Sequence, residues 1–295
     1  MATARLNLTV LGVLLTHAFI YATVVACVVL PTFENSVPGV MNVGVLTINT
    51  VLALLCYVLC VFSDPGKVPE GWSSDPEADT VVTQVKKKGG GARFCQKCQL
   101  PKPPRCHHCR VCKRCVLRMD HHCPWVNNCI GHGNYKTFFL FLIYVTAALV
   151  HALGLLLMHA MHALQKNARQ RRARMGTAMR WTPRGAGPAP GIEMWAALQG
   201  VCVTITFPLT LGLVLLLGWH VYLVLSNKTT IEYHEGVTAK IHAAKRGQAY
   251  KHPYDLGLCG NLHAVLGANL TCWLMPVPVA AEGDGLTFPT GIDPF

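Results

Sequence analysis

The chain has 295 residues, of which 52% are hydrophobic and 14% are charged, and its mean hydropathy is +0.34. Soluble domains carry about 25% charged residues, so this composition excludes an ordinary soluble protein. The net charge of +12 indicates that an anionic surface or ligand faces part of the chain. Of the 14 cysteines, eight lie among histidines in one stretch. This favours metal ligation and thiol chemistry in a reducing compartment over a secreted disulfide scaffold.

Four segments lack Asp, Glu, Lys and Arg and are long enough to cross a hydrocarbon core of about 30 Å. They cover residues 8–30, 40–62, 137–158 and 195–225. Each predicts a transmembrane helix. The first two are separated by a short turn with a proline, which favours a helical hairpin over a signal peptide. The predicted fold class is therefore an all-α polytopic membrane protein with four transmembrane helices.

Four crossings put the N-terminus, the segment between spans two and three, and the C-terminal tail on one side. That side carries 19 Lys and Arg residues, against seven in the loop between spans three and four. The positive-inside rule therefore predicts that this side is cytosolic. The basic loop at about 163–193 is expected to be a largely flexible lumenal segment, with an amphipathic surface segment as the alternative. Residues 282–295 are rich in Gly and Pro, which predicts disorder.

The chain divides into five parts on this interpretation. Residues 1–62 form the first transmembrane hairpin, and 63–94 form a basic linker with a flexible Lys-Lys-Lys-Gly-Gly-Gly hinge. Residues 95–136 form a cysteine-rich domain, 137–225 contain spans three and four, and 226–295 form the cytosolic tail.

Twelve Cys and His residues lie within the 35 residues from 95 to 129. Zinc is the metal that such a set favours, because Cys thiolates and His imidazoles are its usual tetrahedral ligands and a Cys-x2-Cys step lets two of them bend around one ion. Two closed sites would use eight of the twelve. Because the segment has few apolar residues, metal binding would supply much of its folding free energy.

Spacing alone leaves open which four of these residues stay outside the metal sites. Asp120, His121, His122 and Cys123 are adjacent. A carboxylate can fix the tautomer of an imidazole, and the imidazole can take the proton of a thiol nucleophile. The alternative makes His and Cys in this run two further zinc ligands beside a helix-capping Asp. The spacing supports both interpretations equally.

The run closely resembles the cysteine-rich domain of the DHHC-type protein S-acyltransferases, or palmitoyltransferases. The resemblance includes Pro-Trp-Val-Asn-Asn-Cys-Ile-Gly at 124–131, followed by Asn134 and Phe138. It continues in Asp-Pro-Gly at 64–66, similar to the family's DPG motif, and in Thr-Thr-Ile-Glu at 229–232, similar to its TTxE motif. Asn261 resembles the Asn of its C-terminal motif. The resemblance thus covers most of the chain.

The resemblance implies a role for each ligand-capable residue. The two zinc sites that it implies consist of Cys95, Cys98, His108 and Cys115, and of Cys109, Cys112, His122 and Cys129. It leaves Cys123 as the nucleophile, His121 as the general base and Asp120 as the residue that orients His121, with Cys106 as a bystander thiol. Both zinc ions would be structural. It also implies that Thr230 hydrogen-bonds Asp120 and that Asn261 ties the tail to the membrane domain; helix capping is the alternative for both.

The implied reaction takes a long-chain acyl group from palmitoyl-CoA to cysteines of protein substrates in two steps, through acyl-Cys123. The acyl chain would lie among the helices, against Trp125, Phe138 and Phe141. The resemblance further implies that side-chain bulk at Ala148 limits chain length, so a small residue favours palmitate or longer.

The expected partners are acyl-CoA, the lipid bilayer and proteins with a cysteine near the membrane, and not nucleic acid. The expected location is the Golgi or another endomembrane, or the plasma membrane, with the active site facing the cytosol. The basic stretch 86–118 suits both CoA phosphates and anionic lipids.

Two other functions remain as alternatives. The first is a membrane-tethered structural zinc module for protein binding, in which Cys123 would be dispensable. The second is a metal transporter built on the membrane histidines, which is disfavoured because the four spans contain no carboxylate.

Overall fold

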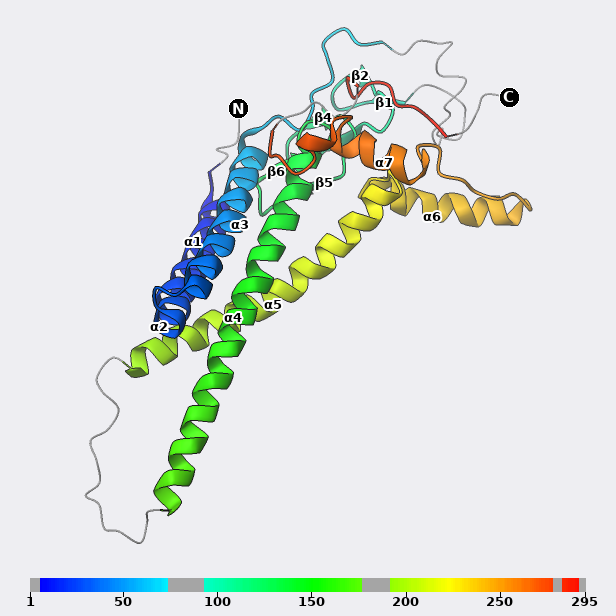
Figure 1. Ribbon diagram of the computed structural model, residues 1–295. Coiled ribbons are helices and arrows are strands. Elements are labelled where there is room, and N and C mark those ends of the chain that lie inside the picture. The colour runs from blue at the N-terminus through cyan, green and yellow to red at the C-terminus, as the bar shows by residue number, and fades with distance from the viewer. Residues whose placement is uncertain (1–5, 74–92, 177–191, 278–282, 292–295) are drawn as a thin grey trace. The chain divides into compact units, whose positions relative to one another are not determined.

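The computed structural model describes residues 6–73, 93–176, 192–277 and 283–291. Within these residues, four helical segments are long and apolar enough to cross a membrane, and they form the long rods of Figure 1. They are Leu8–Phe33, Val37–Phe62, Tyr135–Gln170 and Met194–Leu225. The predicted fold class, with two spans on each side of a cysteine-rich region, is therefore confirmed. The Lys-Lys-Lys-Gly-Gly-Gly hinge lies outside the described residues.

The first span consists of α1 (Leu8–Val24), a π-helical turn (Val25–Val29) and α2 (Leu30–Phe33). The second is α3 (Val37–Phe62), which follows after a short turn. The third and fourth spans are the helices α4 (Tyr135–Gly176) and α5 (Ile192–Leu225). Helices suit these apolar segments because a bilayer offers no hydrogen-bond partners, so each backbone group must find one within its own helix.

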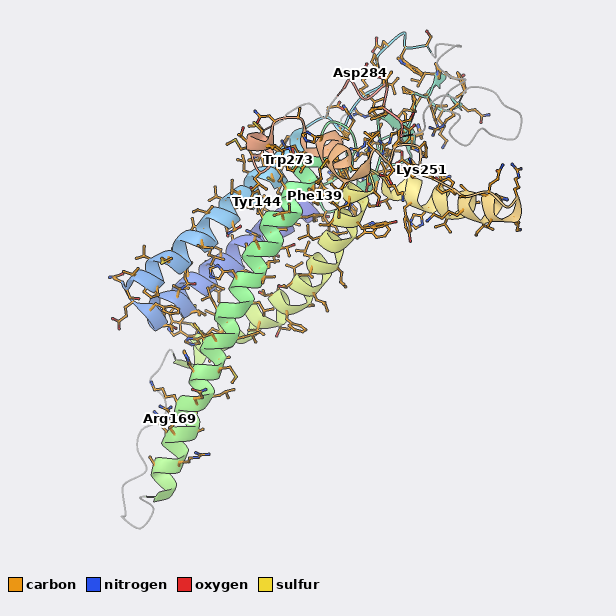
Figure 2. The ribbon with its side chains drawn as sticks, turned by 45° about the vertical axis from the view of Figure 1, so that its right-hand side comes forward. Phe139, Tyr144, Arg169, Lys251, Trp273 and Asp284 are labelled. Atoms are coloured by element: carbon orange, nitrogen blue, oxygen red, sulfur yellow. The ribbon has the colours of Figure 1, made fainter. Side chains whose placement is uncertain are left out.

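Helix α4 is longer than the sequence predicted. The apolar span ends near residue 158, but the helix continues to Gly176, and Figure 2 shows Arg169 on this extension. Residues 159–175 contain neither Gly nor Pro and are rich in Ala, Gln, Lys and Arg, which are good helix formers. The prediction of a flexible loop is therefore wrong up to residue 176, and residues 177–191 lie outside the described part of the chain.

The chain divides into two compact units. The second unit contains Val13–Ala53 and Ile143–Leu215, which are the larger parts of the four spans. Hydrogen bonds join its helices: His151 Nε2 lies 2.9 Å from Asn42 Oδ1, and His159 Nδ1 lies 3.0 Å from Thr32 Oγ1. Polar side chains commonly connect helices within membranes. These two membrane histidines therefore have a packing role.

The first unit joins Leu54–Leu142 with Leu216 and the residues after it, and with the start of α1. Its described strands form three antiparallel two-stranded hairpins. The pairs are β1 (Phe94–Cys95) with β2 (Leu100–Pro101), β3 (His107–Cys109) with β4 (Arg114–Val116), and β5 (His121–Cys123) with β6 (Asn128–Ile130). Each hairpin turns through a residue with a positive φ angle, namely Gln99, Lys113 and Asn127. These tight turns bring the cysteines and histidines together.

Beyond α5 the first unit contains α6 (Thr230–Lys245), α7 (Gly257–Leu266) and a 3₁₀ turn (Leu270–Cys272). The Asn261 side chain donates a hydrogen bond of 2.7 Å to the Leu225 carbonyl at the end of α5 and accepts one of 2.9 Å from the Leu256 amide. Asn261 was expected to tie the tail to the membrane domain, and its bond to Leu225, the last residue of the fourth span, confirms this contact.

The end of the chain was predicted to be disordered, but residues 283–291 are ordered against the first unit. The Gly291 amide donates to the Pro253 carbonyl at 2.8 Å, and His132 Nε2 donates to the Gly283 carbonyl at 3.3 Å. Leu286 packs against buried side chains of the cysteine-rich domain. The composition of this segment is typical of disorder, but contacts with distant residues hold it in place.

Candidate functional site

The first Cys/His cluster consists of Cys95, Cys98, His108 and Cys115, whose ligand atoms all lie within 4.8 Å of one another. The Cys98 and Cys95 sulfurs are 3.2 and 3.5 Å from His108 Nδ1. Tetrahedral zinc with the usual bond lengths separates its ligand atoms by about 3.6 Å. Three thiolates and one imidazole at this spacing fit a structural zinc ion.

The second cluster consists of Cys109, Cys112, His122 and Cys129 and satisfies the same 4.8 Å limit. The three sulfurs lie 3.4–3.7 Å from His122 Nδ1. The chemistry and geometry of this donor set also fit zinc. The structure thus brings together both sets of four residues that the family resemblance implied.

Hairpin register explains how each cluster forms. His108 pairs with Cys115 across β3 and β4, and His122 pairs with Cys129 across β5 and β6, so each hairpin aims two ligands at one point. The preceding Cys-x2-Cys turn supplies the other two ligands of each cluster. The β3–β4 hairpin therefore contributes to both sites, because Cys109 and Cys112 belong to the second cluster.

Cys106 belongs to neither cluster, although it is fully buried. Burial raises the pKa of its thiol to about 11. The side chain therefore stays a neutral thiol at physiological pH, as suits the bystander position that the sequence implied.

Strand β5 separates His122 from His121 and Cys123. Alternate residues of a strand face opposite sides, so His122 points to the second cluster while His121 and Cys123 share the other face. His121 Nδ1 lies 2.6 Å from Asp120 Oδ2, and the Cys123 thiol is near enough to the His121 imidazole to raise its pKa. Asp120, His121 and Cys123 thus lie close together.

Asp120 is fully buried, and α6 holds it in place. The backbone amide of Thr230 donates to Asp120 Oδ1 and the Thr230 hydroxyl donates to Oδ2, both at 2.9 Å. Thr230 is the first residue of α6, where the helix dipole also favours a negative charge. The implied contact between Thr230 and Asp120 is therefore confirmed.

Electrostatics favour a carboxylate–imidazolium pair. Burial alone would raise the pKa of Asp120, but the hydrogen bond and charge of His121 and the Thr230 amide hold it below its usual value. Burial opposes the charged form of His121, but hydrogen bonds to Asp120 and Cys123 and the charges of both raise its pKa to about 9. His121 is therefore suited to accept and hold the proton of the thiol.

A buried ion pair supports the same region. Arg105 donates to both carboxylate oxygens of Glu232, at 2.7 and 2.8 Å. Glu232 also completes a capping box with Thr229 at the start of α6. Nothing in the sequence near Arg105 indicated this contact, because its partner lies 127 residues further along the chain.

His220, near the end of α5, is another residue that the sequence did not assign. It is 1% exposed, its Nδ1 lies 3.1 Å from the Tyr135 hydroxyl, and its ring centroid lies 6.0 Å from that of His121. Phe138 contacts both rings, at 5.4 Å from His121 and 5.1 Å from His220. The sequence could not predict that His220 lies beside His121, because a single histidine in an apolar span does not indicate its partners.

The residues predicted to line the acyl pocket lie in different places. Phe138 is buried beside His121, and Phe141 contacts Tyr57 at a centroid distance of 5.3 Å. Trp125 is 65% exposed, and its carbonyl accepts a hydrogen bond of 2.8 Å from the Tyr57 hydroxyl. Ala148 is buried on α4 in the second unit. Their role as an acyl pocket stays a prediction.

The Asp-Pro-Gly motif packs against the cysteine-rich domain. Arg114 donates to the Asp64 carboxylate at 3.0 Å, the Pro65 carbonyl accepts from the Gly133 amide, and the Gly66 carbonyl accepts from the Leu117 amide. Gly66 has a φ angle of 113°, which residues with a Cβ atom rarely adopt. The motif thus connects the end of α3 to the hairpins.

Comparison with known proteins gives a consistent result. A family model described as DHHC palmitoyltransferase matches residues 88–237. The chain is 43% identical over 289 residues to "Probable protein S-acyltransferase 16" of Arabidopsis thaliana. The alignment covers 97% of this chain and 94% of the relative. It is 37% identical over 263 residues to "Probable protein S-acyltransferase 15" of the same plant, covering 88% and 92%. "Palmitoyltransferase ZDHHC15" of Xenopus laevis is 37% identical over 200 residues, covering 68% and 51%.

Proposed function

Because this chain belongs to the DHHC palmitoyltransferase family and is a protein S-acyltransferase, we propose that Cys123 is the nucleophile that carries the acyl group. The observation that carries this proposal is the 2.6 Å contact between buried Asp120 and His121, next to Cys123 on the same face of β5. The enzyme acts on protein substrates, and the described helices include four candidate transmembrane segments.

Before the first step the proton of the Cys123 thiol lies on His121, whose raised pKa favours the imidazolium, and the Cys123 thiolate attacks the thioester carbonyl of acyl-CoA. The bond to the CoA sulfur breaks, and CoA leaves with the proton from His121. The product is a thioester on Cys123. Its bond energy is close to that of the substrate thioester, so the enzyme conserves the acyl group in an activated form.

In the second step the thiol of a substrate protein gives its proton to His121 and attacks the carbonyl of acyl-Cys123. The bond to the Cys123 sulfur breaks, and Cys123 recovers a proton from His121. Asp120 keeps His121 in one orientation and stabilises its charged form in both steps. Thr230 in turn keeps Asp120 in place.

The two Cys/His clusters would hold structural zinc. Each closed set of four ligands leaves no position for substrate, so zinc, when bound, supplies cross-links between the hairpins. His122 then anchors β5 on one face, while His121 and Cys123 on the other face keep their relative positions.

We further propose palmitoyl-CoA as the acyl donor, with Trp125, Phe138 and Phe141 along the acyl chain and Ala148 as the residue that limits its length. The hairpins lie beside the ends of α3 and α4 in the first unit, which supports a site at the membrane surface. Acceptors would then be proteins with a cysteine near the membrane. We place the site on the cytosolic face of the Golgi or another endomembrane, or of the plasma membrane, because the side that carries it has the excess of Lys and Arg.

The test is autoacylation of the full-length protein in detergent with alkyne-labelled palmitoyl-CoA. We expect the wild type to acquire a label that hydroxylamine removes, and Cys123→Ser to acquire none while it retains about two zinc ions per chain. Cys259→Ser, which changes an exposed cysteine on α7, is the matched control and should label as the wild type does. Equal labelling of Cys123→Ser and the wild type would contradict the proposal and favour a tethered zinc module.

A further inference from the structure

The ordered segment 283–291, here called the strap, belongs to the first unit and is the red coil beside β1 and β2 in Figure 1. Its last residue is fixed twice, because the Gly291 amide donates to the Pro253 carbonyl at 2.8 Å and Lys251 Nζ donates to the Gly291 carbonyl at 3.0 Å. Figure 2 labels Lys251 at this end and Asp284 near the other end. Between the two ends, Phe288 is the aromatic residue of the strap.

Phe288 covers the buried arginine of the ion pair described above. The guanidinium carbon of Arg105 lies 4.9 Å from the centroid of the Phe288 ring and 4.3 Å from that of Tyr254, and the two ring centroids are 5.9 Å apart. Arg105 is 1% exposed. Aromatic faces at this distance attract a guanidinium and keep water from it.

Arg105 is the first member of a continuous series that ends at the reactive thiol. It holds both carboxylate oxygens of Glu232, which closes the capping box with Thr229. The next residue, Thr230, donates two hydrogen bonds to Asp120. Each contact in the series is 3.2 Å or shorter up to the bond between Asp120 and His121.

The energetics of a buried ion pair make this cover important. A charge pair in a dry environment is strong and directional, whereas water that reaches it weakens the attraction and lets the side chains move. If Phe288 were absent, water would reach the Arg105 guanidinium from the side of the strap. Glu232 and the start of α6 would then be held less firmly, and so would the two bonds from Thr230 to Asp120.

We propose that Phe288 is a positioning residue for the acyl transfer reaction: by covering Arg105 it holds the start of α6, and thereby Asp120 and His121, in the arrangement that activates Cys123. This inference rests on the proposed roles of Cys123, His121 and Asp120. Phe288 itself touches neither the substrate nor the reacting atoms.

The primary test compares Phe288→Ala with Thr287→Ala in the full-length protein. Thr287 is the exposed neighbour of Phe288 in the strap, which makes it a matched control. We measure the rate of acyl-Cys123 formation as a function of palmitoyl-CoA concentration. Phe288→Ala should lower kcat by about tenfold or more, because small misplacements of catalytic groups have large effects. KM and the zinc content should be unchanged, and Thr287→Ala should match the wild type.

A double-mutant cycle with Thr230→Ala tests whether the effect passes through Asp120. If it does, Phe288→Ala in the Thr230→Ala background should cause little further loss, because the contact that it supports is already removed. Phe288→Tyr, which keeps the aromatic face, should retain nearly the full rate. If the role of Phe288 were purely structural, the losses of kcat in the two single variants would multiply in the double variant, and KM and the melting temperature would change together.

Three outcomes would overturn the inference: a wild-type rate for Phe288→Ala, multiplicative losses in the cycle, or a loss of rate that only follows loss of zinc. If Phe288→Ala fails to fold, Phe288→Leu decides, since the smaller side chain keeps an apolar residue in the strap but removes the ring over Arg105 and leaves part of the guanidinium uncovered. A several-fold loss of kcat with unchanged zinc would support the inference, and a wild-type rate would reject it. An unlabelled, zinc-loaded wild type would instead contradict the proposed function.

Discussion

At the scale of single residues, His121 lies between two groups that both favour its charged form. A free histidine has a pKa of about 6.5, but Asp120 and Cys123 raise the pKa of His121 to about 9 despite its burial. A proton on His121 is therefore held firmly, which fits the role proposed for this residue. This shift also makes the stability of the protein depend on pH.

The sign of this dependence follows from the direction of the shift. A group whose pKa is higher in the folded state stabilises the fold fully below its unfolded pKa and loses that contribution as the pH rises through its folded pKa. The melting temperature of the wild type should thus exceed that of His121→Gln by an amount that shrinks from about pH 6.5 to about pH 9. Thermal unfolding at constant zinc concentration measures this, with His234→Gln, a change at an exposed histidine of α6, as control. A difference that stays constant across this range would contradict the assigned pKa.

At the scale of elements, the three hairpins have strands of only two or three residues. Strands this short are not stable by themselves, and their apolar contacts are few, so the fold of the hairpins depends on the clusters that cross-link them. Replacement of one cluster residue should therefore destabilise the whole hairpin region and not only the contacts of that side chain.

Cys115 and Cys106 form a matched pair for testing this dependence, because both are buried but only Cys115 belongs to a cluster. Cys115→Ser should lose at least one of the two zinc ions that eight ligands would hold, and should lower the melting temperature. Cys106→Ser should keep both ions. Zinc per chain, measured by atomic emission on the purified variants, decides this. Loss of zinc from Cys106→Ser would mean that the ligand assignment is wrong.

The elements also show what the sequence could and could not predict. Charge-free segments predicted the four spans, and Cys-x2-Cys spacing predicted two metal sites, because both patterns are local. The ligand sets required a resemblance to a family, since twelve candidate residues allow several choices. His220 and Arg105 act through partners far away in the chain, and the strap is ordered by such contacts alone. Local patterns contain no information about them.

At the scale of the whole molecule, α4 contains both Phe138 and Ala148, which lie ten residues or about 15 Å apart along the helix. If the acyl chain follows this helix, the volume of residue 148 limits its length.

Ala148→Tyr should therefore shift the preference from palmitoyl-CoA toward shorter acyl-CoAs. Competition between acyl-CoAs of different length, read from the mass of the acyl group on Cys123, measures the shift. Ala147→Tyr adds the same side chain at the neighbouring exposed position of α4 and should leave the profile unchanged. An identical chain-length profile for Ala148→Tyr and the wild type would exclude Ala148 from the acyl pocket.

The hydrogen bonds from Thr230 to Asp120 join residues that are 110 positions apart, and this separation matters during biosynthesis. A ribosome makes the cysteine-rich domain well before it makes the fourth span and the helix after it. Cys123 is therefore present in the nascent chain while Asp120 still lacks its hydrogen bonds from Thr230. The contact between Thr230 and Asp120 forms only after all four spans have been synthesised, so a chain that stalls before this point lacks the arrangement proposed for the active site.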